Sequence, residues 1–287
     1  MSAASREPTG AAVPGRRSDE GATREGIASR APGGEWDSTA APTAVVVGAT
    51  GSIGAAVVRR LVRRRLPVLA VARSKDALDT LAGESELITA CPADIGSNDA
   101  VQAIGSAITG PVRIAVFAAG LPVRGSADTI DPDALAAGTN IKAGGLLRLL
   151  HAVRDHLVPG SRFVTFAGSL GLEPRAHEAG PGAVNAAVFN LMRQISLLYG
   201  PRGVTTHTLS PGPADTPRLR RIVAAVAAER GAAEGDVWQE YVAQNSLGRL
   251  PTADEVAWAV EVLLDPEADL LHGSVLYLDA GGHRGIH

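Results

Sequence analysis

Apolar residues along the chain form short continuous runs that alternate with segments of helical periodicity. Seven runs rich in β-branched residues follow residue 43, at 44–48, 67–72, 86–90, 113–118, 162–167, 204–210 and 274–280. These runs are apolar almost throughout, which is typical of strands covered by helices on both faces. The pattern therefore predicts seven buried strands.

The segments between the runs carry apolar residues on one side of a helix. Ile53, Val57 and Leu61 recur at four-residue spacing, and arginines occupy the outer face of the same helix. Strands that alternate with helices are joined by right-handed crossovers, which make neighbouring strands parallel. We therefore expect an α/β fold in three layers, a doubly wound parallel sheet of seven strands with helices on both faces.

Composition separates the first 42 residues from the rest. They mix Ser, Gly, Pro, Ala and charges, with Val13, Ile27 and Trp36 as the large apolar groups, too few to offset the entropy of ordering. We expect a disordered tail at 1–42. The remaining chain, 43–287, is long enough for one large core and is predicted to form a single domain.

Charge and cysteine content exclude several kinds of partner. The net charge is −3 and no region gathers Lys and Arg without acids, so nucleic acid is not an expected partner. The single cysteine, Cys91, excludes an internal disulfide and suits a reducing compartment. No apolar run approaches the ~18 residues of a membrane span, and the histidines lack metal-ligand spacing. We expect a cytoplasmic protein with no membrane contact and no metal.

The first strand runs directly into a glycine-rich turn, GATGSIG at 48–54. Glycines at such a turn let backbone N–H groups and the helix N-terminus approach a pyrophosphate. The turn therefore predicts a dinucleotide site. Its predicted cofactor-binding residues are Gly48, Thr50, Gly51, Ser52, Ile53 and Gly54.

The end of the second strand indicates which dinucleotide binds. An acid at this point would bind the ribose hydroxyls and repel a 2′-phosphate, but here Arg73, Ser74 and Lys75 follow the strand. Guanidinium, hydroxyl and ammonium groups can bind a phosphate, so NADP(H) is favoured over NAD(H). The alternative is a solvated basic helix start that Asp76 partly neutralises.

Taken in order, these motifs and four later ones resemble the short-chain dehydrogenase/reductase family over residues 44 to about 283. GATGSIG is similar to the family's opening motif, although its middle glycine is displaced by one position and Val47 replaces the usual Thr. The later motifs are PADI at 92–95, FAAG at 117–120, TNIKAG at 139–144 and SPGPADTP at 210–217. A closing helix, strand and glycine pair complete the likeness.

The resemblance implies a Rossmann-type sheet and further cofactor contacts. These contacts are expected from Asp94, Ile95, Ala118, Ala119, Gly120, Asn185, Pro211, Gly212, Ala214 and Thr216. It also implies a substrate lid at about 215–247. Self-association as a homodimer or homotetramer is expected through the helices near 132–157 and 183–199.

The family's catalytic residues are a Ser after the fifth strand and a Tyr-x-x-x-Lys motif in the next helix. An alignment without insertions places Gly168, Pro181 and Asn185 at these three positions. Proline has no proton to donate, and the loss of a positioned acid costs a factor of about 10²–10⁴ in rate. Asn185 can still bond the nicotinamide ribose, though without positive charge.

Several other residues are candidates to replace the missing groups. Our catalytic assignment is Asn140, through linked waters, with His177 as a proton donor and Asn185. Ser169 can present a hydroxyl, Arg175 can stabilise an oxyanion, and Tyr241 can reach inward from the lid. A loop serine, a solvated charged loop and simple lid packing are the competing interpretations of these residues.

Three functions are compatible with this site. The first is an NADPH-dependent reductase that acts on a quinone or conjugated carbonyl of an apolar small molecule. The second is an enzyme of the same fold repurposed for non-redox cyclisation, dehydration or isomerisation. The third is a non-catalytic NADP-binding or scaffold protein. We take the first as the main hypothesis, because the motifs that bind the cofactor are retained.

Overall fold

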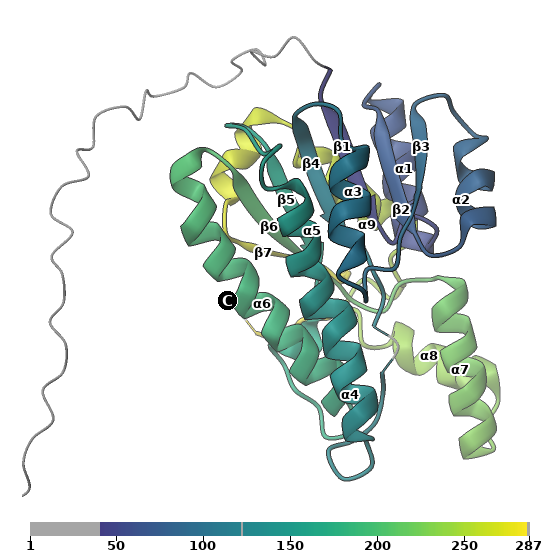
Figure 1. The fold of residues 1–287 in the computed structure, drawn as a ribbon. Coiled ribbons are helices and arrows are strands. Elements are labelled where there is room, and N and C mark those ends of the chain that lie inside the picture. Colours follow the sequence, from purple (N-terminus) through teal and green to yellow (C-terminus); the bar gives the residue numbers. More distant parts are fainter. Residues whose placement is uncertain (1–40, 122, 286–287) are drawn as a thin grey trace, which may run out of the picture. The chain divides into compact units, whose positions relative to one another are not determined.

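The computed structural model describes residues 41–121 and 123–285, so the predicted tail lies outside the described residues except for its last two positions. The predicted seven-stranded parallel sheet is confirmed (Figure 1). Its strands are β1 (Thr43–Val47), β2 (Val68–Ala72), β3 (Ile88–Pro92), β4 (Val112–Phe117), β5 (Arg162–Phe166), β6 (Thr205–Pro211) and β7 (Val275–Leu278).

The strand order is β3-β2-β1-β4-β5-β6-β7, with every neighbouring pair parallel. The chain moves outward from β1 to β3 on one side and from β4 to β7 on the other. The connections therefore diverge between β1 and β4. In an open parallel sheet, the crevice at such a switch point is where ligands bind, beyond the carboxyl ends of the strands.

Helices cover both faces of the sheet, as the continuous apolar runs predict. They are α1 (Ser52–Arg63), α2 (Lys75–Ala82), α3 (Asp99–Ala107), α4 (Pro132–Thr139), α5 (Gly145–Val153), α6 (Ala179–Tyr199), α7 (Pro217–Arg230), α8 (Glu234–Val242) and α9 (Ala253–Val262). A π-helical turn, η1 (Asn140–Gly144), joins α4 to α5, and the 3₁₀ turns are η2 (Ser169–Gly171), η3 (Gly200–Arg202) and η4 (Pro266–Leu271).

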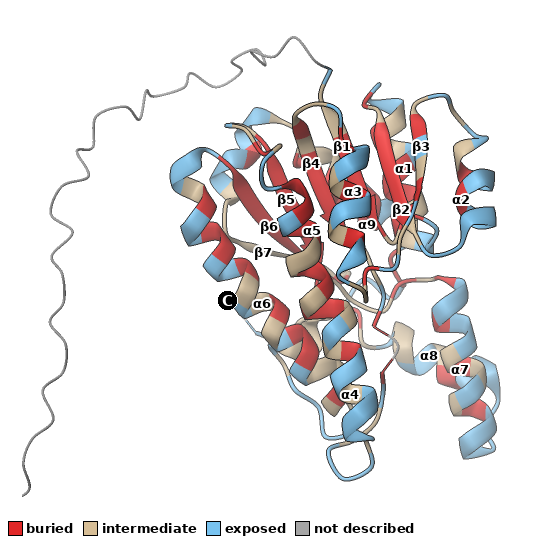
Figure 2. Ribbon diagram, viewed as in Figure 1, coloured by how far each residue is buried: buried red, intermediate tan, exposed pale blue. Residues whose placement is uncertain are grey.

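Buried residues gather along the strands and on parts of the helices (Figure 2). Each face of the sheet has its own apolar core. Val45 and Val47 of β1 pack in the core under α3, α5 and α6. Ala44 and Val46 pack in the other core, with α1, α2 and α9. Successive side chains of a strand point to opposite faces, so both the odd and the even positions of β1 must be apolar.

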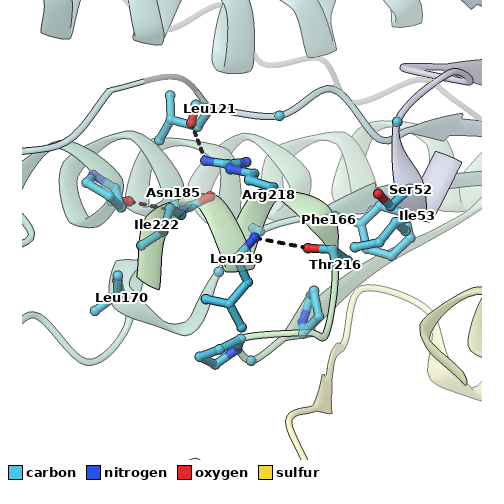
Figure 3. Close-up of a pocket in the computed structure, with 18 of the residues that line it drawn as sticks. Ser52, Ile53, Leu121, Phe166, Leu170, Asn185, Thr216, Arg218, Leu219 and Ile222 are labelled. Atoms are coloured by element: carbon cyan, nitrogen blue, oxygen red, sulfur yellow. Dashed lines mark hydrogen bonds between the residues drawn. The ribbon is translucent and has the colours of Figure 1, made fainter. Parts of the chain in front are cut away.

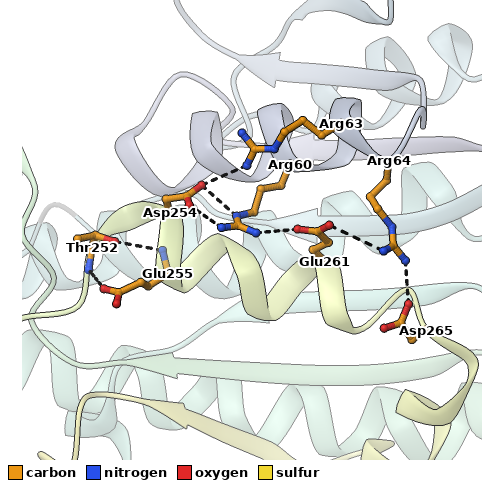
Figure 4. A network of polar contacts seen from close by, with 8 residues as sticks. All are labelled: Arg60, Arg63, Arg64, Thr252, Asp254, Glu255, Glu261 and Asp265. Atoms are coloured by element: carbon orange, nitrogen blue, oxygen red, sulfur yellow. Dashed lines mark hydrogen bonds and ion pairs between the residues drawn. The ribbon is translucent and has the colours of Figure 1, made fainter.

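Ion pairs fasten α1 to α9 (Figure 4). The arginines on the outer face of α1 contact acids of α9: Arg60 bonds Asp254 at 2.5 Å and Glu261 at 2.7 Å. The N-terminus of α9 is closed by a capping box in which Thr252 and Glu255 bond each other's backbone N–H. Because α1 begins at the glycine turn, these contacts hold one wall of the ligand crevice.

Two helices, α7 and α8, lie beyond the carboxyl ends of the strands (Figure 1). They form a small apolar cluster of their own, in which Leu219, Val223 and Ala227 of α7 pack with Val237 of α8. This region coincides with the predicted lid. None of the helices among the described residues has the length and apolar character to cross a membrane.

Candidate active site

Two adjoining cavities, of about 620 Å³ and about 1050 Å³, open at the carboxyl ends of the central strands. They share residues of the glycine turn after β1, of the loop after β4 and of α7. The shared lining residues are Thr50, Gly51, Ala118, Ala119, Gly120, Leu121, Arg124, Arg218, Arg221 and Ile222. The two cavities therefore form one groove across the β1/β4 switch point.

The glycine turn is shaped so that only glycine fits at its ends. Gly48 has a φ of +80°, and a Cβ there would lie 2.7 Å from the carbonyl carbon of Ala118. A Cβ on Gly54 would lie 2.1 Å from the Gly48 oxygen. The N-cap of α1, Gly51, makes no side-chain cap hydrogen bond, and Ser52 and Ile53 line the first cavity (Figure 3). The turn thus presents the start of α1 to the groove as an anion site, and these residues fit a dinucleotide pyrophosphate.

The second cavity extends past the end of β2. Arg73, Ser74, Asp94 and Ile95 line it, as predicted for the adenosine end of the cofactor. Ser74 caps α2, accepting a bond from the Ala77 N–H at 3.3 Å. Lys75 is not among the lining residues, because its ammonium pairs with Asp79 at 2.5 Å. Arg73 is therefore the cation next to β2 that lines this end of the groove.

The first cavity holds the three positions that the alignment assigned to catalysis. Gly168, Pro181 and Asn185 all line it. Asn185 is buried, and its Nδ2 donates to the Pro181 carbonyl at 2.8 Å (Figure 3). A Cβ on Gly168 would stand 3.3 Å from the same Nδ2. The three positions thus meet in space, yet none of their side chains carries an acidic proton.

Pro181 belongs to α6 and not to a preceding loop. The helix begins at Ala179, so Pro181 lies in its first turn. A proline is tolerated there because the first N–H groups of a helix have no partner within the helix. The substitution therefore removes the family's tyrosine without disturbing the helix that carries Asn185.

The turn after β6 lies beside these positions. Pro211, Gly212 and Thr216 line the first cavity. The Thr216 hydroxyl caps α7 by accepting from the Leu219 N–H at 3.3 Å (Figure 3). Ala214, also predicted to bind the cofactor, is buried and lines neither cavity.

Two of the predicted catalytic side chains do not reach the groove. The Asn140 amide donates to the Gly96 carbonyl at 2.9 Å, and its oxygen accepts from Arg148 at 2.7 Å. His177 is exposed, and neither it nor Asn140 lines a cavity. This placement argues against both assignments, because the loop after β3 and Arg148 of α5 engage the Asn140 side chain, and His177 is exposed.

The other suggested substitutes do line the first cavity. Ser169, Arg175 and Tyr241 are among its lining residues. Arg175 also donates to the Gln244 amide oxygen at 2.9 Å, which ties the loop after β5 to the segment after α8. The described residues contain no group of three or more His, Cys, Asp or Glu arranged to hold a metal ion.

Sequence reasoning overlooked Lys142, a buried residue of η1 that lines the first cavity. Its Nζ donates to the Ala119 carbonyl at 3.0 Å and lies 5.5 Å from the centre of the Phe117 ring. Burial, and next the positive charge of Arg218, lower the pKa of this lysine to about 7. The sequence itself sets this residue apart, because Lys142 is one of only two lysines in the chain.

Arginines give the groove a positive character. Arg124, Arg218 and Arg221 line both cavities, and Arg218 donates to the Leu121 carbonyl at 2.5 Å (Figure 3). Burial lowers the pKa of Arg218, and the like charges of Arg124 and Arg221 add to this effect. Glu178 offsets part of the charge through a contact of 3.7 Å with Arg124. The groove is therefore suited to a ligand with anionic groups.

Comparison with known proteins agrees with this geometry. A family model described as enoyl-(acyl carrier protein) reductase matches residues 48–283. The chain belongs to the short-chain dehydrogenase/reductase family. It is thus an oxidoreductase of this family.

Two curated relatives and one solved structure illustrate the likeness. The short-chain reductase protein NovJ of Streptomyces niveus is 27% identical over 249 residues, which cover 83% of this chain and 92% of that protein. The cis-4-hydroxycyclohexanecarboxylate dehydrogenase of Sinomonas cyclohexanicum is 28% identical, with 83% and 95% covered. The crystal structure of BdcA in complex with NADPH is 26% identical, with a TM-score of 0.71 and coverages of 86% and 98%.

Proposed function

We propose that this protein is an NADPH-dependent reductase that acts on a quinone or a conjugated carbonyl of an apolar small molecule. One observation carries the proposal: a single groove joins an intact dinucleotide end to a reaction end whose three catalytic positions are Gly168, Pro181 and Asn185. When bound, reduced nicotinamide supplies a hydride at the reaction end. What the chain itself must provide is binding, orientation and a proton.

The cofactor end supports NADP(H). Gly48 and Gly54 allow the close backbone packing of the turn that presents the start of α1 to the groove, and Arg73 lines the groove where a 2′-phosphate would lie. The similar structure of BdcA contains NADPH. Asn185 lines the reaction end with its amide and can bond the nicotinamide ribose.

The missing acid limits the carbonyl that can be reduced. Hydride addition to an ordinary ketone forms an alkoxide, a strong base that requires a positioned proton donor. Addition to a quinone or a conjugated carbonyl forms a delocalised anion, which is much less basic. The matching family model is described as an enoyl-(acyl carrier protein) reductase, and an enoyl group is by definition a carbonyl conjugated with a C=C bond. The altered positions therefore favour a conjugated acceptor.

The walls of the first cavity favour an apolar acceptor. Leu121, Phe166, Leu170, Leu219 and Ile222 line it (Figure 3). Such walls stabilise an apolar ligand by the area that they remove from water, about 25 cal/mol per Å². Arg124, Arg218 and Arg221 lie where the two cavities meet. We therefore expect the charged part of the ligand to point toward the cofactor end.

The proposal is tested by measuring NADPH oxidation with matched acceptors. Menadione represents quinones, the N-acetylcysteamine thioester of crotonate represents conjugated carbonyls, and cyclohexanone represents simple ketones. We expect turnover with at least one of the first two and a rate with cyclohexanone lower by about 10²–10⁴. Equal or faster reduction of cyclohexanone would contradict the proposal. Tight NADPH binding without turnover on the whole panel would favour the non-redox or scaffold functions instead.

We also propose that the chain forms a homodimer or homotetramer through α4, α5 and α6. Supporting this, α6 exposes Leu197 and Leu198, whose exposed fractions are 64% and 67%. Two consecutive exposed leucines on a helix whose other side packs on the core favour a protein interface at this end of α6. Light scattering coupled to gel filtration measures the mass directly.

A further inference from the structure

Lys142 combines burial, a position at the reaction end and an irregular backbone. Only 5% of the residue is exposed, and it lines the first cavity. It lies in a π-helical turn, an energetically unfavourable element that is frequent at functional sites. An ammonium group has three N–H donors, and the one hydrogen bond found for Lys142 within the described chain goes to the Ala119 carbonyl.

The charges around Lys142 do not neutralise it. No carboxylate of the described chain forms an ion pair with its ammonium, although its neighbour in the cavity, Arg218, is positive. The other charged groups that line this cavity are Arg124, Arg175, Glu178 and Arg221. Burying a cation without a counter-charge is costly, and residues kept in this state are candidates for function.

We propose that Lys142 is the catalytic acid of this site and that Arg218 stabilises the oxyanion to which Lys142 gives its proton. This inference rests on the proposed reductase function. It differs from the family's arrangement because the proton donor lies on η1 between α4 and α5, and not on α6. With Lys142 as the acid, the site needs neither a proton donor at position 181 nor a positive charge at position 185.

The step balances for a conjugated carbonyl. The hydride that bound NADPH would supply forms a C–H bond at the β-carbon and leaves NADP⁺, the C=C electron pair moves toward the carbonyl, and the carbonyl oxygen becomes that of an enolate. The Lys142 ammonium gives one proton to that oxygen and becomes a neutral amine, while the enol rearranges to the saturated carbonyl. A proton from water then restores the ammonium. The sum is one NADPH and one proton consumed for each acceptor reduced.

The titration of Lys142 suits this role. Its pKa is lowered to about 7, mainly by burial, so it is an acid of the right strength near neutral pH. The rate should fall as the pH rises through this value, because the ammonium is the active form. Folding stability should change in the opposite direction. The unfolded chain binds the proton up to pH 10.5 and the folded chain only to about 7, so stability rises with pH between these values.

The test uses Lys142→Met, with Arg154→Met as the matched control. Arg154 is an exposed cation that follows α5 and lines neither cavity. With menadione and the crotonate thioester, we expect Lys142→Met to lower the maximal rate by about 10²–10⁴ and to abolish its decline at higher pH. Arg154→Met should keep the wild-type maximal rate and its decline at higher pH. NADPH affinity, measured by fluorescence, should change less than about threefold in either variant, which shows that the groove is intact.

A second measurement does not depend on turnover. The chain has two lysines, Lys75 and Lys142, so protein labelled with ¹³C-lysine gives two Cε signals in NMR. We expect the Lys142 signal to titrate near neutral pH and to be absent from Lys142→Met. Lys75 should remain protonated at pH values above the titration of Lys142, because its hydrogen bond to Asp79 raises the pKa of Lys75.

The outcomes separate this inference from the function on which it rests. If wild-type protein reduces an acceptor and Lys142→Met keeps the rate and its pH dependence, Lys142 is not the acid and the reductase function stands. A Lys142 signal that titrates in the ordinary range of lysine also overturns the assignment. If wild-type protein binds NADPH but reduces no acceptor, the reductase function fails and the catalytic role of Lys142 fails with it.

Discussion

Replacing Arg73 with alanine should remove the preference of this protein for a phosphorylated cofactor. Arg73 lines the second cavity directly after β2, at the adenosine end of the groove. The neighbouring Lys75 is held by Asp79 at 2.5 Å, and Ser74 caps α2. The variant therefore deletes the cation next to β2 that we expect to contact a 2′-phosphate, while the glycine turn and the α1 N-terminus stay in place.

The magnitude follows from the kind of bond that is lost. A hydrogen bond to a charged group contributes about 1.5–3 kcal/mol, and 1.4 kcal/mol is a factor of about ten in affinity. The range expected for NADPH is thus about 10- to 150-fold weaker binding. Arg73 is exposed, so water and salt screen its charge and we expect the lower end, about tenfold. NADH lacks the 2′-phosphate, and its affinity should change by less than about twofold.

Fluorescence titration of wild type and Arg73→Ala with NADPH and NADH measures all four affinities. Arg154→Ala is the control for a general loss of positive charge. Repeating the wild-type titration at higher salt should reduce the ratio of NADPH affinity to NADH affinity, because salt screens the phosphate contact more than the uncharged contacts. The reasoning is refuted if wild type binds both cofactors equally, or if Arg73→Ala weakens both to the same extent.

Three further changes have defined outcomes. Gly54→Ala places a Cβ 2.1 Å from the Gly48 oxygen; it should lower stability by about 1–3 kcal/mol and weaken NADPH binding more than tenfold, as thermal melting and the same titration would show. Thr252→Ala breaks the capping box with Glu255 and should cost about 0.5–2 kcal/mol in urea unfolding, with NADPH affinity retained. Leu198→Glu puts a charge on a residue that is 67% exposed; it should lower the mass found by light scattering without lowering the melting temperature of the subunit, and an unchanged mass would argue against α6 as the interface.

The fold was predictable because the apolar runs reflect burial on both faces. In β1, Val45 and Val46 lie in different cores. A strand in the middle of the sheet therefore needs apolar residues at successive positions. The prediction was less accurate at β3, which spans Ile88–Pro92 where 86–90 was expected. β3 is an edge strand with exposed positions, and its weaker pattern does not mark where pairing begins.

The cofactor end was predictable for a different reason. The residues that line it come from a backbone turn and from strand ends, whose order along the chain fixes their order in space. The reaction end depends on side-chain direction, which sequence spacing does not give. Asn140 lies two residues from Lys142, yet the Asn140 amide contacts Gly96 and the lysine contacts Ala119. A π-helical turn does not follow the 3.6-residue period, so no periodicity argument could assign these directions.

The charge state of Lys142 depends on which residue occupies position 185. Asn185 and Lys142 line the same cavity, and Arg218 already lowers the pKa of Lys142. A lysine at position 185, as in most of the family, would add a further cation to this cavity and would drive Lys142 further toward the neutral amine. An uncharged amide at 185 can still bond the ribose, as we propose, and leaves the Lys142 ammonium populated near neutral pH. The loss of the family's lysine and the presence of a buried lysine on η1 are therefore consistent parts of one electrostatic arrangement, in which the positive charge of the site has moved from α6 to the turn between α4 and α5.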